Sequence, residues 1–244
     1  MPARWVLSLM WGNRSESLEE SSERLRNALN AIASIDGRFA SWFIETVSDD
    51  QRVLWDARGP SNATPVRLGA ETSSIALGEN ETVVTVSTVR LENGLSGART
   101  AEGVLSFGLS LVPPSMWFPN SFELRFSCDR DDPLLQADAA RALAIAAATP
   151  FEPLIGAFLP LKWGEENGTL ILEGKILPGW LTLVSQRLGK APETIAPVIF
   201  QDSRFQVLAV SSARFDPDDA AQTKSARRMI DELGQTFHLE NGIG

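Results

Sequence analysis

The fold is decided by a stretch near the start of the sequence, WVLSLMWGNRSESLEE, at residues 5–20. Its first half is mostly apolar and ends at Trp11-Gly12, which is typical of a buried strand followed by a bend. Ser17 and Glu20 then have the spacing of a capping box, in which each side chain accepts a hydrogen bond from the other residue's backbone amide. Helical spacing continues in the apolar residues Leu18, Leu25, Leu29, Ile32 and Ile35. The stretch therefore predicts a strand, a bend and an amphipathic helix.

Further strands are predicted where apolar and polar residues alternate, or where Val and Thr concentrate. These stretches are 82–89, 104–111, 122–126, 158–163, 169–176, 181–185 and 206–210. The dipeptide Asn167-Gly168 tolerates positive φ and predicts a hairpin between two of them.

Two more helices are predicted downstream. Pro133 fits the first turn of a helix that runs to about Ala148. Asp216-Pro217-Asp218-Asp219 predicts the cap of a last helix, because carboxylates accept hydrogen bonds from its first amides and oppose its dipole.

The order of these elements predicts the fold class. Adjacent strands joined by turns favour an antiparallel sheet, with three main helices packed on it. We therefore expect a single α+β domain over residues 1–244, with 43% hydrophobic residues to build its core. Six tryptophans lie in or beside predicted elements, and we expect them in that core. They are Trp5, Trp11, Trp42, Trp55, Trp163 and Trp180.

Charge and cysteine content narrow the function classes. The net charge of −9 argues against direct nucleic-acid binding, which needs a basic face, and suits either a basic protein partner or simple solubility. Cys128 is the only cysteine, so no intramolecular disulfide forms and a reducing compartment is expected. No apolar run approaches the ~20 residues needed to span a bilayer. We expect a soluble, cytoplasmic protein without membrane contact.

The sequence offers little catalytic chemistry, so we expect neither an enzyme nor a cofactor or metal site. His238 is the only histidine, and one His with one Cys does not make a zinc site. Glu173-Gly-Lys175 is an alternative, because a strand carboxylate and lysine form half of a restriction-endonuclease-type site that uses Mg²⁺. No upstream aspartate has a suitable spacing to complete it.

Three stretches of the sequence resemble those of a known family. The opening stretch at residues 5–20, with its strand, Trp-Gly bend and helix entrance, resembles that of the immunity protein 52 family, antidotes of bacterial polymorphic toxin systems. Gly179-Trp180-Leu181 is similar to an internal strand of that family, and residues 211–216 with the helix that follows resemble its closing unit. The motif residues expected to be structural are Trp11, Gly12, Arg14, Glu16, Ser17, Gly179 and Trp180.

The resemblance implies a cytoplasmic immunity protein that binds and neutralises a secreted toxin. It implies a nuclease toxin of restriction-endonuclease fold, delivered by a type VI or similar secretion system. An antidote needs a tight interface rather than catalysis. A metal-dependent enzyme using Glu173 and Lys175, or a non-catalytic adaptor of a secretion system, remains the alternative.

Candidate toxin contacts follow from exposed aromatic and acidic residues. Trp117-Phe118 lies between prolines in a predicted loop, where the pair either plugs the core or contacts a partner. The acidic candidates are Asp129, Asp131, Asp132, Glu165 and Glu166. The cluster at 129–132 also has the composition of a cation site, but it lacks the glycine and distal glutamate of a calcium loop. A solvated helix start ahead of Pro133 is the preferred interpretation.

Overall fold

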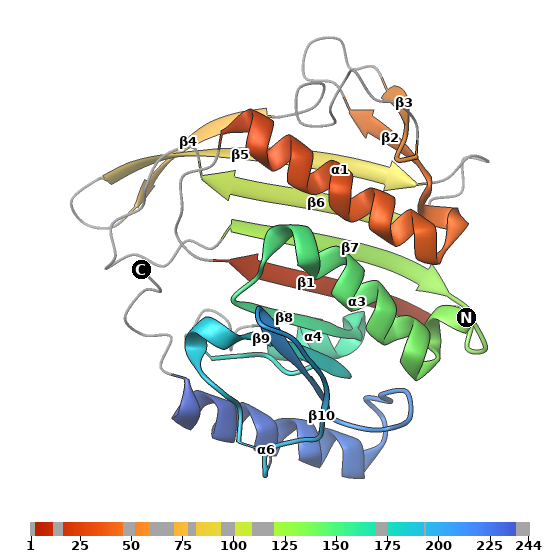
Figure 1. Cartoon of the computed structure of the whole chain (residues 1–244), viewed down its shortest axis with the longest axis vertical. Helices are drawn as coiled ribbons and strands as arrows, with labels where there is room; N and C mark the ends of the chain where they lie inside the picture. Colours follow the sequence, from red (N-terminus) through yellow and green to blue (C-terminus); the bar gives the residue numbers. More distant parts are fainter. Residues whose placement is uncertain are drawn as a thin grey trace.

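The computed structural model describes residues 3–11, 17–45, 52–58, 71–77, 82–93, 101–108, 120–168, 175–192 and 194–237. In this part of the chain eleven strands form one sheet in the order β10-β11-β9-β8-β1-β7-β6-β5-β2-β3, with β4 paired to β5 (Figure 1). The pairs are antiparallel throughout, which confirms the predicted α+β class.

The strands are β1 (Ala3–Trp11), β2 (Ser41–Glu45), β3 (Arg52–Asp56), β4 (Glu71–Leu77), β5 (Thr82–Asn93), β6 (Ala101–Gly108), β7 (Asn120–Cys128), β8 (Ile155–Pro160), β9 (Leu181–Ser185), β10 (Val198–Gln201) and β11 (Phe205–Ala209). The α-helices of the described ranges are α1 (Leu18–Ile35), α3 (Ala137–Phe151), α4 (Leu161–Asn167) and α6 (Ala220–Thr236). Short 3₁₀ helices are η1 (Gly37–Phe39), η2 (Pro133–Leu135) and η3 (Gln186–Leu188).

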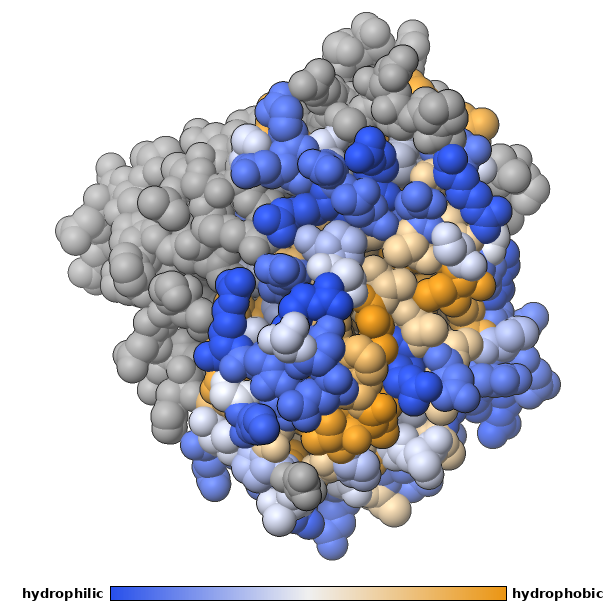
Figure 2. All heavy atoms as spheres, viewed as in Figure 1, coloured by the Kyte–Doolittle hydropathy of each residue, from blue (hydrophilic) through white to orange (hydrophobic). Residues whose placement is uncertain are grey.

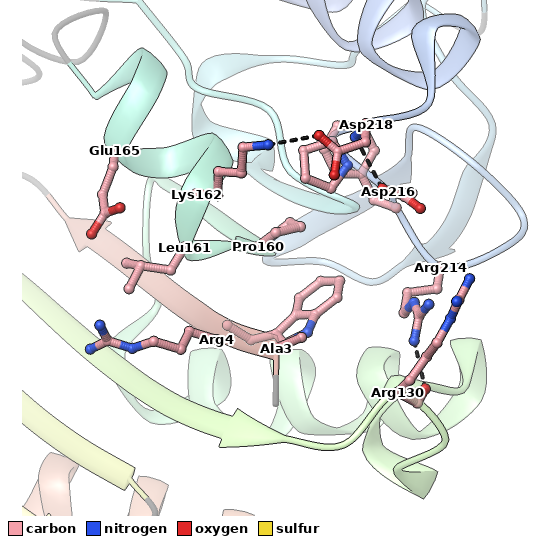
Figure 3. A pocket seen from close by; sticks show the side chains of 13 residues that line it. Ala3, Arg4, Arg130, Pro160, Leu161, Lys162, Glu165, Arg214, Asp216 and Asp218 are labelled. Carbon is pink, nitrogen blue, oxygen red and sulfur yellow. Dashed lines mark hydrogen bonds and ion pairs between the residues drawn. The ribbon is translucent and has the colours of Figure 1, made fainter. Parts of the chain in front are cut away.

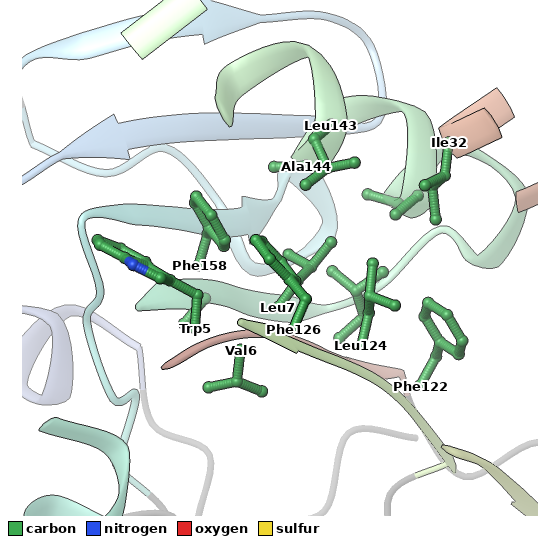
Figure 4. Packing of buried hydrophobic residues seen from close by; sticks show 14 of the residues in the cluster. Trp5, Val6, Leu7, Ile32, Phe122, Leu124, Phe126, Leu143, Ala144 and Phe158 are labelled. Atoms are coloured by element: carbon green, nitrogen blue, oxygen red, sulfur yellow. The ribbon is translucent and has the colours of Figure 1, made fainter. Parts of the chain in front are cut away.

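Strand β1 lies in the middle of the sheet, between β7 and β8, and the largest core forms over one of its faces. Helices α1 and α3 run across this face (Figure 1). Leu7 of β1 and Leu124 of β7 pack there against Ile32 of α1 and Leu143 of α3, all fully buried (Figure 4). Burying one such side chain stabilises the fold by about 1.5–3 kcal/mol, so this layer holds the two helices on the sheet.

The opposite face is covered at the β1–β11 end of the sheet. Val184 and Leu208 alternate with main-core residues on β9 and β11, and they pack in a second cluster with Met229 and Leu233 of α6. Helix α4 lies over Leu159 of β8. Further along the sheet, β7 presents charged side chains on this side. Among the described residues, the buried second layer therefore covers this face from β11 to about β1.

The structure contains the helix caps and the buried tryptophans that the sequence predicts. Ser17 Oγ accepts a hydrogen bond from the Glu20 amide at 3.2 Å, and Glu20 Oε2 accepts one from the Ser17 amide at 2.9 Å. The last helix begins after Asp219, whose carboxylate accepts from the amides of Ala221 and Gln222. The six tryptophans expected in the core are all at most 5% exposed, as predicted.

The predicted hairpin around Asn167-Gly168 is wrong. The chain enters α4 directly after Pro160, and Gly168 has a right-handed backbone with φ of −62°. Leu161 and Trp163 turn their apolar side chains inward, and Trp163 Nε1 donates to the Pro178 carbonyl at 2.9 Å. This packing favours a helix over a strand. Residues 169–174 of the second predicted strand lie outside the described ranges.

Other boundaries also differ from prediction. Pro133 opens η2 rather than an α-helix, and α3 begins at Ala137 and continues through Pro150 to Phe151. Strands β2, β3, β4 and β10 were not predicted, because their short segments carry weak alternation.

Candidate functional site

A cleft of about 440 Å³ opens at the corner where the start of β1, the β8–α4 junction, the turn after β7 and the segment after β11 meet (Figure 3). We call it the corner cleft. Its charged lining residues are Arg4, Arg130, Lys162, Glu165, Arg214, Asp216 and Asp218. Its uncharged lining residues are Ala3, Trp5, Pro160, Leu161, Phe215 and Pro217. Residues far apart in sequence therefore build one cavity with apolar walls and a charged rim.

Aromatic packing makes the wall of the corner cleft rigid. Trp5 is 2% exposed, and its ring lies beside that of Phe158 (Figure 4), with centroids 5.1 Å apart. The ring centroid of Trp180 lies 5.8 Å from that of Trp5. Phe215 meets Trp163 edge-on at 5.4 Å on another side. These rings are fixed before any ligand arrives.

The indole of Trp5 carries an unsatisfied donor. Its Nε1 is buried and has no hydrogen-bond acceptor among the described residues. Leaving a buried N–H unpaired costs roughly 1–3 kcal/mol, and buried donors are usually satisfied. Nε1 exposes less than 1 Å² of surface, so the unpaired donor is a cost of packing this indole in the core.

The cationic side chains of the cleft are unequally paired. Lys162 Nζ contacts Asp218 Oδ1 at 2.7 Å, and this hydrogen bond raises the pKa of Lys162. Arg214 Nη1 donates to the Arg130 carbonyl at 2.5 Å (Figure 3). Within the described part of the chain, the guanidinium groups of Arg4 and Arg130 contact no carboxylate. The cleft thus holds arginines that are free to bind an acceptor.

The balance of charge in the cleft differs from that of the whole chain. Four cationic and three anionic side chains are among the described residues that line it, which leaves one positive charge in excess. The chain as a whole carries −9. The lining of the cleft is therefore less acidic than the chain as a whole, although the exposed Asp129, Asp131 and Glu166 are next in sequence to its lining residues.

The structure places the predicted acidic contacts around this cleft, but not inside one cluster. Asp129 and Asp131 are exposed on either side of Arg130, which lines the cleft. Glu165 lines it from α4, and Glu166 is exposed beside it. Figure 3 shows Arg130 and Glu165 on opposite sides of the cavity. The two acidic segments therefore flank one opening.

Asp132 is placed differently from the other acidic candidates. Its side chain is 8% exposed and forms an ion pair with Arg38, while Oδ1 also accepts from the Leu134 amide at 3.0 Å. The hydrogen bond from Arg38 holds the pKa of Asp132 below its usual range. The Asp132 carboxylate is thus bound to Arg38 and caps the start of η2, as expected for a helix start ahead of Pro133. Trp117 and Phe118 lie outside the described residues.

The residues of the family-like motifs have packing roles where they are described. Trp11 stacks on Phe151 with ring centroids 4.7 Å apart. Gly179 lies so close to β8 that an added Cβ would meet the Phe158 carbonyl oxygen at 2.5 Å. Trp180 is 1% exposed, and its Nε1 donates to the Ser211 carbonyl at 3.2 Å. Gly12, Arg14 and Glu16 lie outside the described ranges.

The candidate catalytic residues are not assembled in the described ranges. Lys175 is exposed and belongs to no strand, whereas Glu173 and His238 lie outside those ranges. Burial raises the pKa of the Cys128 thiol to about 12. No three His, Cys, Asp or Glu side chains converge as metal ligands among the residues searched.

Sequence reasoning missed the arginines of the corner cleft. Arg4 precedes the first strand, Arg130 sits inside an acidic run, and Arg214 lies in the motif at 211–216. Each looks like an isolated surface cation in sequence. Only the topology of the sheet places them along one cleft, with Arg4 on one side and Arg130 and Arg214 on the other (Figure 3).

A second surface lies on the helix-bearing face. Figure 2 shows hydrophilic residues over α1 and an apolar strip over α3 that continues towards β10. On α3, Ala142 is exposed while Ile145 and Ala146 are half-buried, and on β10 Ile199 and Phe200 are half-buried. This strip shares no residue with the corner cleft.

Comparisons with known proteins bear on the fold. No protein-family model matches the chain, and no functionally described protein matches its sequence. A solved structure of the Pseudomonas aeruginosa T6SS protein PA0821 is similar, with a TM-score of 0.53 and 12% identity over 98% of this chain and 78% of that chain. Among the described helices, none has the length and apolar character required to cross a membrane.

Proposed function

We propose that this chain is a cytoplasmic immunity protein that binds and neutralises a toxin of a type VI or similar secretion system. The observation that carries the proposal is the similarity of its fold, over nearly its whole length, to that of a T6SS protein. The motifs around Trp11 and Gly179 support it independently, since they resemble those of an immunity family.

The physical character of the surface suits inhibition of a nuclease. An enzyme that degrades nucleic acid needs a basic surface for phosphates, and a chain of net charge −9 complements such a surface. Exposed carboxylates at Asp129, Asp131, Glu165 and Glu166 are available for this role. The rigid aromatic walls of the corner cleft limit the ordering cost of binding.

The test is coexpression, in a bacterial host, with the protein encoded by the neighbouring open reading frame, which we expect to carry a toxin domain. The expected result is survival of cells that carry both proteins, together with a complex that copurifies when a catalytically inactive toxin is used. An unrelated acidic protein of similar net charge is the control. The absence of both protection and a complex would contradict the proposal. Binding to a secretion component without protection would favour an adaptor.

A further inference from the structure

We propose that a second copy of this chain pairs with strand β3, antiparallel and edge to edge, so that Leu54 meets Leu54 of the other copy on a two-fold axis. This contact goes beyond the proposed function and does not depend on it. Strand β3 is the last strand in the sheet order and lies at the top of the view in Figure 1. Within the described part of the chain only β2 pairs with it, so its other edge is open.

Backbone groups at this edge point outward at alternate residues. The Ala57 amide donates to the Ala40 carbonyl at 2.7 Å, one register step beyond the last pair of β2 with β3. Hydrogen-bonded and non-bonded pairs alternate along an antiparallel ladder, so the amides and carbonyls of Leu54 and Asp56 point away from β2. A second strand centred on Leu54 would supply the partners that these groups lack among the described residues.

The face of β3 that points away from the main core is apolar at its centre. Leu54 is 55% exposed, the largest exposure of any bulky apolar side chain that the structure describes. Half-buried Phe43 stands beside it in register on β2, whereas Trp42 and Trp55 are buried in the main core. In a two-fold pair the Leu54 side chains of the two copies would cover each other. This contact would remove apolar surface from water.

The order of charges along β3 favours a second copy as the occupant of this edge. From residue 52 onward the strand reads Arg-Val-Leu-Trp-Asp. Antiparallel pairing centred on Leu54 places Arg52 opposite Asp56 of the other copy, and it places Val53 opposite Trp55. Opposite charges and aromatic–β-branched pairs stabilise such a ladder, whereas like charges destabilise it. The strand is therefore complementary to itself, so two chains of net charge −9 can meet here.

The other end of the sheet lacks these features. Strand β10 has four residues, Pro197 precedes it, and its register with β11 shifts between Val198 and Phe200. Short length, bulges and prolines keep edge strands from pairing. Strand β3 has an unbroken register with β2 and contains no proline. Of the two end strands, β3 is therefore the one with a regular backbone to offer a second copy.

Sedimentation of the wild-type protein between about 1 and 500 µM tests the association. The contact is small, so the expected result is a reversible dimer with a Kd of roughly 1–100 µM. Leu54→Lys would bring two ammonium groups together on the axis and should weaken the dimer at least about tenfold. The matched control is Ile35→Lys at the end of α1, where the side chain is 37% exposed, and it should leave the dimer intact. A wild-type protein that stays monomeric, or equal effects of the two variants, would overturn the proposal.

Reversal of charge tests the register. Asp56→Arg and Arg52→Asp each place like charges opposite one another in the pair, so each should weaken self-association about tenfold or more. Mixing the two variants restores opposite charges at both ends of the pair, and a heterodimer of about wild-type affinity should form. Failure of the mixture to associate would overturn the antiparallel pairing centred on Leu54.

The outcomes also separate a second copy from another occupant. If the wild-type protein is monomeric and Leu54→Lys abolishes its complex with the product of the neighbouring reading frame, the edge belongs to that partner and the proposed dimer fails. If the wild-type protein dimerises but neither binds that product nor protects against it, the proposed function fails and the dimer stands.

Discussion

Arg38 and Asp132 form a two-pronged ion pair, with Nη1 2.6 Å from Oδ2 and Nη2 2.8 Å from Oδ1, between residues 94 positions apart. The pair joins η1, which follows α1, to η2, which precedes α3. Arg38 also contacts Asp36 at 2.6 Å. The pair therefore ties the ends of the two helices on the main core, and it fixes the turn that places Arg130 at the corner cleft.

Replacing Asp132 by Asn should lower the free energy of unfolding by roughly 1–3 kcal/mol at pH 7. Asn keeps an oxygen for the Leu134 amide but loses the charge that Arg38 binds. Because the pKa of Asp132 is depressed in the folded state, its stabilisation is present above the unfolded pKa of about 3.9 and is lost as pH falls through the folded pKa.

Urea unfolding at pH 7 and at pH 2.5 measures this effect. The difference between wild type and Asp132→Asn should shrink at the lower pH. The exposed Asp131→Asn should differ little from wild type at either pH. A difference of equal size at both pH values would assign the loss to packing instead of charge.

Gly179→Ala should destabilise the fold by about 1–3 kcal/mol. The new Cβ would meet the Phe158 carbonyl oxygen at 2.5 Å and Leu159 Cβ at 2.9 Å, and backbone atoms cannot move aside cheaply. Gly234→Ala in α6 is the matched control, because nothing lies within 4 Å of its added Cβ. It should raise stability by roughly 0.5–1 kcal/mol through helix propensity. Thermal unfolding of the two variants gives the comparison, and a tolerant Gly179 would contradict the close approach.

The parts of the fold that follow from local chemistry could be predicted from the sequence. The capping box of Ser17 and Glu20 and the cap at Asp219 depend only on neighbours in the chain. Helix α4 could not be predicted in this way, because the burial of Leu161 and Trp163 depends on the sheet beneath them. There tertiary packing outweighs the turn preference of Asn-Gly.

The candidate site shows the same division more strongly. Acidic runs at 129–132 and 165–166 are visible in sequence, and the structure brings both to one opening. The contact between Arg214 and Arg130 spans 84 residues and depends on the crossing of the chain after β11. The acidic residues near the cleft could therefore be predicted from the sequence, whereas its arginines could be identified only from the structure.

Alkylation of Cys128 should report opening of the fold. The thiol is 4% exposed, and burial raises its pKa to about 12. At pH 8 iodoacetamide should modify the folded chain at least about a hundredfold more slowly than the urea-unfolded chain. The protein has one cysteine, so mass spectrometry reads the site directly. Rapid labelling of the folded chain would contradict the burial of this thiol.

The same thiol predicts a loss of stability at alkaline pH. The unfolded chain releases this proton near pH 8.5, whereas the folded chain keeps it to higher pH. Stability should therefore decline as pH rises above about 8.5. Cys128→Ser removes this titrating group, so the free energy of unfolding of the variant should depend less on pH above about 8.5. An equal decline in the variant would assign the pH dependence to other groups.

Association with the proposed toxin should be steered by charge, and the salt dependence of the on-rate measures this. The net charge is −9, and raising salt from about 0.05 to 0.5 M shortens the Debye length to below about 5 Å. The on-rate should fall about tenfold or more over this range.

Glu165→Gln/Glu166→Gln removes two exposed charges beside the corner cleft and should slow association at low salt, with little effect on dissociation. The control Glu23→Gln/Asp138→Asn makes the same charge change on α1 and α3. An equal or larger effect of this control would place the approaching toxin over the helices instead of the cleft.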